Sequence, residues 1–93
     1  MKLTLFYLET CPYCHNARRA LKELVEENAA YGAVPIDWIE ESRQPSLAER
    51  YDYYYVPTVY DGEDKLYEAA PGESYDECKA HLKAVLDAVV NRA

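Results

Sequence analysis

Two cysteines three positions apart are the residues of this sequence best suited to chemistry. Cys11 and Cys14 enclose a proline and a tyrosine in the segment Cys11-Pro12-Tyr13-Cys14. In the first turn of a helix this spacing brings the two sulfurs together, so that one thiolate can attack a disulfide and the second sulfur can resolve the mixed disulfide. The motif predicts thiol–disulfide exchange, with Cys11 as the exposed nucleophile, Cys14 as the shielded resolving thiol, and Pro12 and Tyr13 as supporting residues.

The segments on either side of the motif determine the electrostatic environment of the two cysteines. Apolar, β-prone residues over 2–8 predict a short strand, and a helical stripe of alanine, leucine and valine follows over 12–28. We expect Thr10 to cap this helix and Pro12 to stand at its start. Cys11 then lies at the helix N-terminus, where unpaired N–H groups and the positive end of the helix dipole stabilise a thiolate. Cysteine pKa values at such places fall from ~8.5 to roughly 3.5–7.5.

Five further elements complete the predicted chain. They are strands over 34–39, 56–60 and 65–69 and helices over 45–53 and 75–91. The expected local signals are capping boxes at Ser46/Glu49 and Ser74/Glu77 and a hairpin turn at Asp61-Gly62. The order β-α-β-α-β-β-α predicts an α/β fold in one domain spanning residues 1–93, with a four-stranded mixed sheet and helices on both of its faces.

Net charge and cysteine content limit which partners and which cellular compartment we expect. Ten lysines and arginines stand against 17 aspartates and glutamates, a formal net charge of −7. A chain with this charge repels nucleic acid and anionic membranes, so we expect neither as a partner. No apolar run approaches the ~18–20 residues that cross a bilayer, and because residues 1–10 lack the pattern of a secretory leader we do not expect export. Three cysteines cannot all pair, which favours a reducing compartment, and we expect a cytoplasmic monomer.

A second interpretation uses the same cysteines as metal ligands. Cys78 and His81 lie one helical turn apart, and together with Cys11 and Cys14 they match the ligand count of a Cys3His zinc site. An iron–sulfur cluster shared between two chains, or an adaptor module without turnover, is a related alternative. Structural zinc sites usually draw such pairs from knuckles or loops, whereas Cys78 falls on an apolar helical stripe that favours a buried thiol. We expect no resident metal and no other cofactor.

The motif and its flanks resemble a known family. The stretch FYLETCPYCH at residues 6–15 is similar to the active-site segment of dithiol glutaredoxins, which belong to the thioredoxin-like superfamily. The resemblance implies the thioredoxin-like fold and an enzyme that reduces protein or small-molecule disulfides through a Cys11/Cys14 cycle. It also implies that Pro57 is cis and lies beside Cys11, and that the backbone of Val56 pairs with a bound thiol substrate as an added strand does.

A second stretch corresponds to the segment that binds glutathione in that family. Pro71-Gly72-Glu73-Ser74 falls where glutaredoxins have a Gly-Gly segment before the last helix, whose N-terminus receives the γ-glutamyl carboxylate. The resemblance therefore implies Tyr13, Val56, Pro57, Gly72, Glu73 and Ser74 as residues that contact glutathione or another thiol substrate. The segment Val56-Pro57-Thr58 is also similar to the N-terminal domain of glutathione transferases, but we expect no second helical domain here.

Four departures from the family pattern bear on the electron donor. Leu8 stands where glutaredoxins commonly have a cation, and Tyr55, Pro71 and Ser74 replace a threonine, a glycine and an aspartate. The missing cation removes a partner for the glycine carboxylate of glutathione. We therefore expect glutathione to be a poor co-substrate, and the reductant to be either glutathione or an enzyme of the thioredoxin-reductase type.

Several aromatic and basic residues near these segments have structural interpretations. We expect Tyr51, Tyr53, Tyr54 and Tyr55 to pack partly into the core with wet hydroxyls, although they could also flank the active site. Arg18 and Arg19 could attract anions, but a solvated helix face is the interpretation we favour.

Overall fold

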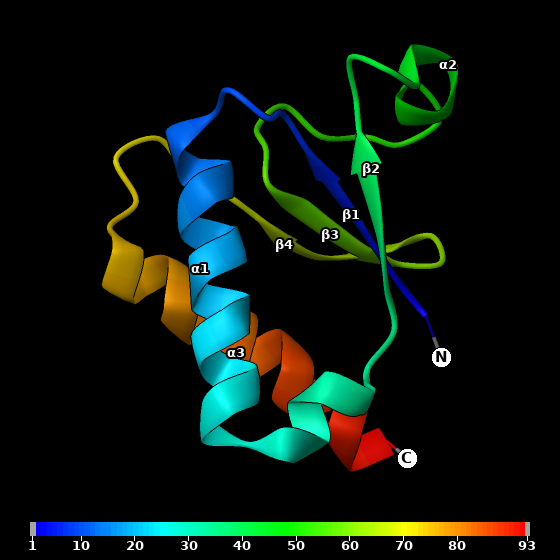
Figure 1. Ribbon diagram of the computed structural model, residues 1–93. Coiled ribbons are helices and arrows are strands. Elements are labelled where there is room, and N and C mark those ends of the chain that lie inside the picture. Colours follow the sequence, from blue (N-terminus) through cyan, green and yellow to red (C-terminus); the bar gives the residue numbers. More distant parts are fainter. Residues whose placement is uncertain (1, 93) are drawn as a thin grey trace.

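The strands and helices follow one another in the predicted order (Figure 1). The structure is a computed structural model that describes residues 2–92. Its elements are β1 (Leu3–Tyr7), α1 (Pro12–Glu27), the 3-10 helix η1 (Ala29–Ala33), β2 (Ile36–Glu40), α2 (Pro45–Ala48), β3 (Thr58–Asp61), β4 (Asp64–Glu68) and α3 (Tyr75–Arg92). The sequence analysis did not anticipate η1.

The four strands form one mixed sheet in the order β2-β1-β3-β4. Strand β1 runs parallel to β2, with Leu3 opposite Ile36, and antiparallel to β3, with Leu5 opposite Val59. Strands β3 and β4 form the expected hairpin, whose turn places Gly62 at a φ of 60°. Positive φ is strained for residues with a side chain, so a glycine suits this position. The α/β prediction with a four-stranded mixed sheet is confirmed.

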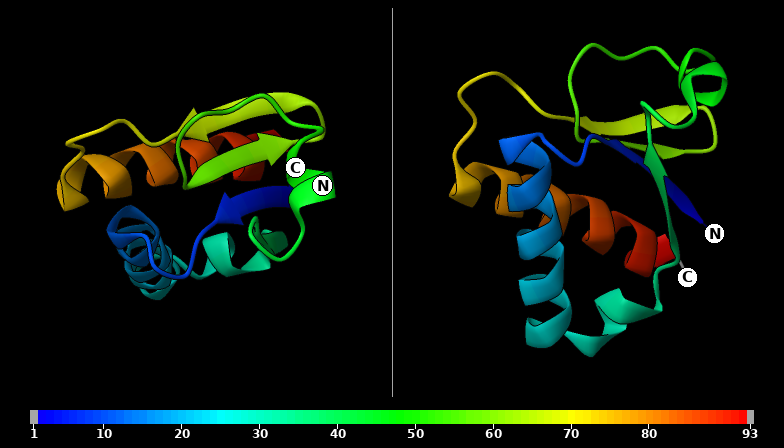
Figure 2. Two further views of the ribbon diagram at one scale, coloured as in Figure 1. Left: turned by 90° about the horizontal axis from the view of Figure 1, so that it is seen from above. Right: turned by 45° about the horizontal axis from the view of Figure 1, so that its top comes forward.

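The two long helices cover one face of the sheet. They pack against each other and lie on the same side of the strands (Figure 2). Leu3 and Leu5 of β1, both 1% exposed, point into this layer. Leu24 of α1 and Leu82 of α3 belong to the same cluster. This core fixes the position of α1 relative to the end of β1, which is where the cysteine motif begins.

The other face is closed mainly by aromatic rings. Phe6, which is fully buried, has its ring centroid 4.7 Å from that of Tyr51, 5.1 Å from that of Tyr53 and 6.2 Å from that of Tyr60. The short helix α2 adds Leu47 and Ala48 to this cluster. Helices therefore lie on both faces as predicted, but α2 is a single turn and tyrosines do most of the covering. Tyr51 and Tyr53 are partly buried, as expected, whereas Tyr54 and Tyr55 are exposed, contrary to the prediction.

Tyrosine hydroxyls in the described part of the chain also bind carboxylates. Four of these pairs are Tyr31 with Asp87, Tyr53 with Glu41, Tyr67 with Glu73 and Tyr75 with Glu23. In each pair a neutral O–H donates to an acidic side chain. Asp87 and Glu23 also bind lysine side chains and Glu73 binds His81, so the tyrosine hydroxyl is a further partner for these three carboxylates. This gives a physical role to four of the ten tyrosines in an acidic sequence.

Helices α1 and α2 begin where the sequence predicted, at Pro12 and Pro45, but their capping residues differ from the prediction. The N-cap of α1 is Cys11 rather than Thr10, and α2 ends at Ala48 with Gln44 as its N-cap, so the Ser46/Glu49 box does not form. In both helices a proline takes the first helical position, which assigns the cap to the residue before it. Strands β2 and β3 likewise begin after their prolines, at Ile36 and Thr58 rather than at 34 and 56.

The capping box before α3 forms as predicted. Ser74 Oγ accepts a hydrogen bond from the Glu77 N–H at 3.1 Å, and a Glu77 carboxylate oxygen accepts one from the Ser74 N–H at 3.0 Å. Cys78 follows in the first turn and is buried, as its place on the apolar stripe indicated. Within residues 2–92, no helix is long and apolar enough to span a membrane.

Candidate active site

The cysteine motif lies at the junction of β1 and α1. Cys11 has extended backbone angles (φ −86°, ψ 122°), and its carbonyl accepts hydrogen bonds from the N–H groups of Cys14 and His15, both at 3.1 Å. Pro12 provides the first helical residue and has no N–H of its own to satisfy. The first turn is therefore wound tightly around the Cys11 carbonyl, and the Cys11 side chain stands at the positive end of a 16-residue helix.

The two sulfurs of the motif differ in accessibility. Both are free thiols, Cys11 is partly exposed and Cys14 is 3% exposed. The pKa of Cys14 is raised to about 12, chiefly by burial and also by the neighbouring Cys11 thiol, while the Leu8 N–H that donates to its sulfur at 3.4 Å opposes the rise. Cys14 is thus a protonated thiol at neutral pH, held beneath an accessible partner.

The loop before β3 faces the accessible sulfur. The Cys11 thiol donates to the carbonyl oxygen of Val56 across 3.8 Å, and the Val56–Pro57 peptide bond is cis. Thr58 Oγ1 donates to the Tyr55 carbonyl at 2.5 Å, which fixes the turn on the other side of the proline. The structure therefore brings Val56 and Pro57 beside Cys11, where an extended substrate could pair with the backbone.

The segment before α3 reaches the motif through Tyr13. The Gly72 N–H donates to the Tyr13 hydroxyl at 2.8 Å, and Gly72 has a φ of 81°. Glu73, in contrast, points inward: its side chain is 3% exposed and accepts hydrogen bonds from the Tyr67 hydroxyl and from His81 Nδ1 at 2.9 Å. Three residues of this segment were predicted to contact a thiol substrate. Of these, Gly72 lies beside the motif, Glu73 is buried in the interior, and Ser74 caps α3.

The predicted tyrosine flank divides into two parts. Tyr51 and Tyr53 pack on Phe6, whereas Tyr54 and Tyr55 are 84% and 51% exposed directly before Val56. The backbone N–H groups of Tyr54 and Tyr55 donate to one carboxylate oxygen of Glu68 at 2.6 and 2.8 Å. Strand β4 therefore anchors the exposed pair, which the sequence could not reveal because Glu68 is remote along the chain.

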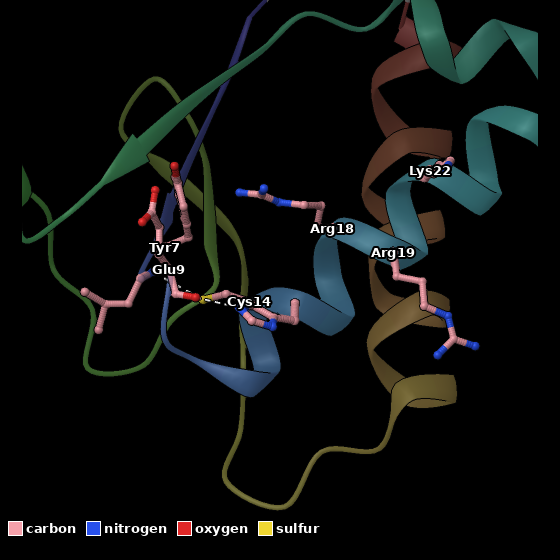
Figure 3. Close-up of a pocket in the computed structure, with 8 residues that line it drawn as sticks. Tyr7, Glu9, Cys14, Arg18, Arg19 and Lys22 are labelled. Carbon is pink, nitrogen blue, oxygen red and sulfur yellow. Dashed lines mark hydrogen bonds between the residues drawn. The ribbon is translucent and has the colours of Figure 1, made fainter.

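A cavity of about 590 Å³ opens between the end of β1 and α1 (Figure 3). Its lining residues are Tyr7, Leu8, Glu9, Cys14, His15, Arg18, Arg19 and Lys22. Leu8 lies here, at the position where the family usually has a cation. His15 is exposed, and its Nε2 contacts the Glu9 carbonyl rather than either sulfur.

The structure does not assemble the four predicted zinc ligands. Cys78 is buried between α1, α3 and the sheet, where burial raises the pKa of its thiol. His81 is bound to Glu73, and Cys14 belongs to the cluster on the other face. Within residues 2–92, no three histidine, cysteine or acidic side chains are placed to hold a metal ion together. The Cys3His interpretation is therefore wrong for this arrangement.

The fold and the paired sulfurs define a thioredoxin-like dithiol protein. Thioredoxin 1 from Thermosipho africanus TCF52B superposes with a TM-score of 0.59 at 21% identity, over 96% of this chain and 98% of that one. A variant thioredoxin from Halobacterium salinarum NRC-1 gives 0.56 at 20% identity, over 89% of this chain and 72% of that one. At these identities the likeness concerns the fold alone.

Sequence comparison identifies the family within that class. The glutaredoxin family profile matches residues 3–64, from β1 to the start of β4, and the chain belongs to the glutaredoxin family. A thioredoxin of Methanocaldococcus jannaschii is 31% identical over 71 residues, covering 76% of this chain and 81% of its own length. Glutathione S-transferase F9 of Arabidopsis thaliana is 32% identical over 59 residues, which are 62% of this chain but 27% of the transferase. The chain therefore spans about a quarter of that relative.

Proposed function

We propose that the protein is a thiol–disulfide oxidoreductase that reduces disulfides of proteins or small molecules through Cys11 and Cys14. The Cys11 thiolate attacks one sulfur of the substrate disulfide, forming a mixed disulfide and releasing the other sulfur as a thiolate. Cys14 then loses its proton and attacks the Cys11 sulfur, which releases the second substrate thiol. Two electrons pass to the substrate, and the protein is left with a Cys11–Cys14 disulfide.

The observation that supports this cycle is the asymmetry between the two sulfurs. The accessible sulfur stands at the N-terminus of α1, where a substrate disulfide can reach it. The second sulfur is close enough for the two thiols to hydrogen-bond, yet burial keeps it protonated until the mixed disulfide forms. This order prevents both sulfurs from reacting with separate substrates. Membership of the glutaredoxin family supports thiol chemistry of this general kind.

The loop at Val56 supplies the surface on which the substrate would lie. Its carbonyl already accepts a hydrogen bond from Cys11, so a substrate cysteine taking the place of that proton would lie beside the backbone at 56–57. An extended substrate segment would then pair with Val56, and the exposed Tyr54 and Tyr55 would border it. Tyr13 and Gly72 would form the opposite border.

We expect the electron donor to be a reductase or a dithiol protein rather than glutathione. Leu8 offers no charge to the glycine carboxylate of glutathione, and Tyr13 already occupies the Gly72 N–H that would meet its γ-glutamyl carboxylate. The identity to an archaeal thioredoxin agrees with a donor other than glutathione. A dithiol cycle of this type operates in a reducing compartment, for which we propose the cytoplasm, with the protein acting as a monomer.

Turnover of a low-molecular-weight disulfide, hydroxyethyl disulfide, tests the proposal. Wild-type protein with a thioredoxin-reductase system should consume the disulfide and lose two free thiols on mild oxidation. Cys11→Ser should abolish turnover, whereas Cys14→Ser should accumulate a mixed disulfide that mass spectrometry detects at Cys11. Cys78→Ser, a matched change at the remaining cysteine, should retain turnover. Equal activity of wild type and Cys11→Ser, or stoichiometric zinc or iron in the purified protein, would refute the proposal.

A further inference from the structure

An arginine beside the active-site turn is held in a single orientation by two aromatic rings. The Arg18 guanidinium lies 5.5 Å from the ring centroid of Tyr7 and 5.5 Å from that of Trp38. The two rings pack edge to face, with centroids 5.7 Å apart and planes at 80°. Figure 3 shows Arg18 reaching from α1 across the cavity toward Tyr7, while Arg19 points away from it. Cation–π attraction thus orients this guanidinium before any ligand arrives.

No carboxylate in the described part of the chain neutralises this arginine. Most of the other cations of residues 2–92 are paired; Arg19, for example, is 3.5 Å from Glu23. Arg18 and Lys22 form no ion pair within the same residues, and their spacing of four places them on one face of α1. Glu9, which also lines the cavity, is bound by Arg43 at 3.2 Å. Two free positive charges therefore remain along this side of the helix.

The acidic character of the chain makes the place of Arg18 and Lys22 on α1 the preferred one for an anion. The chain as a whole carries −7, so an anion is repelled by most of the surface and attracted where Arg18 and Lys22 stand. A second cavity of about 430 Å³, between α1 and β2, shares Arg18 and Lys22 with the first and is also lined by Trp38 and, one turn beyond Lys22, by Glu26. At its other end the first cavity reaches Cys14 and His15 of the active-site turn. We call the two cavities that meet at Arg18 and Lys22 the Arg18 groove.

We propose that the Arg18 groove binds carboxylate side chains of an acidic segment in a disulfide-bearing partner protein. The free N–H fork of a stacked guanidinium suits a carboxylate, which it binds in bidentate fashion. Alternate side chains of an extended segment repeat every 6–7 Å or so, close to the spacing of about 5–6 Å between residues four apart on a helix. Two carboxylates on one side of such a segment can therefore meet Arg18 and Lys22 together. A small monocarboxylate would use only one of them.

This inference relies on the proposed function only in taking the partner to carry a disulfide. The groove borders the active-site turn, so a segment bound there would bring the neighbouring part of the partner toward Cys11. The groove would then select acidic substrates and raise the rate of encounter, with an attraction that salt weakens.

Binding can be measured without any redox chemistry. The probe is a fluorescein-labelled oligoglutamate peptide, with a labelled oligoserine peptide as the reference, and fluorescence anisotropy is read on the Cys11→Ser protein at low salt. We expect the oligoglutamate to bind and the double variant Arg18→Gln/Lys22→Gln to weaken this binding by about five- to tenfold. The control is Lys2→Gln/Lys65→Gln, which changes the net charge equally but removes cations that have acidic partners. The control should bind the peptide as tightly as the parent.

The outcomes separate the groove from the proposed function. Equal weakening in both double variants would overturn the groove, because the effect would then be one of net charge. Displacement of the peptide by similar concentrations of succinate or glutathione would also overturn it, since the groove would then serve small carboxylates. A protein that binds the peptide but reduces no disulfide would refute only the proposed function. A protein that reduces hydroxyethyl disulfide but fails to bind the peptide would refute only the groove. With a disulfide-linked acidic peptide as substrate, Arg18→Gln/Lys22→Gln should raise KM far more than it lowers kcat.

Discussion

The hydroxyl of Tyr13 accepts a hydrogen bond from the backbone N–H of Gly72 at 2.8 Å, across 59 positions of sequence. This contact ties the first turn of α1 to the segment before α3. It joins two parts of the site that no secondary-structure hydrogen bond connects. It also means that a carboxylate arriving at Gly72 must displace a protein group.

Removal of this hydroxyl should release the Gly72 amide without unfolding the protein. Tyr13→Phe loses one partly exposed hydrogen bond, which contributes about 0.5–1.5 kcal/mol to the free energy of unfolding. Amide hydrogen exchange should accelerate at Gly72 and remain unchanged in β1 and β3. Tyr54→Phe, at an exposed ring, is the matched control. Unchanged exchange at Gly72 would show that the contact does not hold the segment in solution.

A lysine at position 8 should improve the use of glutathione. Leu8→Lys places an ammonium at the rim of the cavity, where it can pair with the glycine carboxylate, and one exposed pair is equivalent to roughly a two- to fivefold change in affinity. The measured quantity is kcat/KM for reduction of the Cys11–Cys14 disulfide by glutathione. Leu8→Gln controls for the loss of the apolar side chain. If the two variants behave alike, charge at position 8 does not limit the reaction.

The buried thiol of Cys14 should make the reduced protein less stable at high pH. Its pKa is raised to about 12 by burial, whereas an unfolded cysteine titrates near pH 9. Between these values the unfolded chain gives up its proton and the native state keeps it, so the free energy of unfolding falls by roughly 1 kcal/mol per pH unit. Below about pH 9 this contribution is constant.

Denaturant unfolding of the reduced protein over the range from neutral to alkaline pH measures this effect. Cys14→Ala should show a shallower decline than wild type above about pH 9, because it lacks the titrating group. The comparison is needed because Cys78, Tyr53 and Tyr67 also have raised pKa values and add to the decline in both proteins. Parallel curves for the two proteins would contradict the assignment of a buried, protonated Cys14.

The two serines with capping-box spacing should differ in their effect on stability. Ser74→Ala removes the acceptor for the Glu77 N–H at the start of α3 and should lower the free energy of unfolding by about 1 kcal/mol. Ser46→Ala, the same chemical change inside α2, should stay within about 0.5 kcal/mol of wild type because Ser46 caps nothing. Equal losses from the two changes would show that the capping geometry is not what stabilises α3.

Local signals in the sequence predicted what depends on near neighbours. The strand before the motif, the helix after it, the hairpin turn at Gly62 and the Ser74 cap all rest on residues within a few positions of one another. The two wrongly predicted caps have a common cause, because a proline in the first helical position made Cys11 and Gln44 the caps instead of Thr10 and Ser46. A stricter use of that proline preference would have predicted both.

Contacts between distant elements were beyond the sequence. Glu73 appears in the sequence as a polar residue of a loop, and its inward direction depends on Tyr67 from β4 and His81 from α3. The same holds for Arg18, which the sequence places on a solvated helix face. Only the parallel pairing of β1 and β2 brings Trp38 beneath it. Residue type suggested the candidates at this site, and strand register determined which of them meet.

The tyrosine–carboxylate hydrogen bonds and the unpaired cations of α1 should respond differently to added salt. Because the tyrosine of each pair is neutral, added salt has little electrostatic attraction to screen within the hydrogen bond itself. The unpaired side chains of Arg18 and Lys22 on α1 respond in the opposite way, because added salt screens their attraction for anions. High salt should therefore release an acidic partner while leaving these hydrogen bonds of the fold in place.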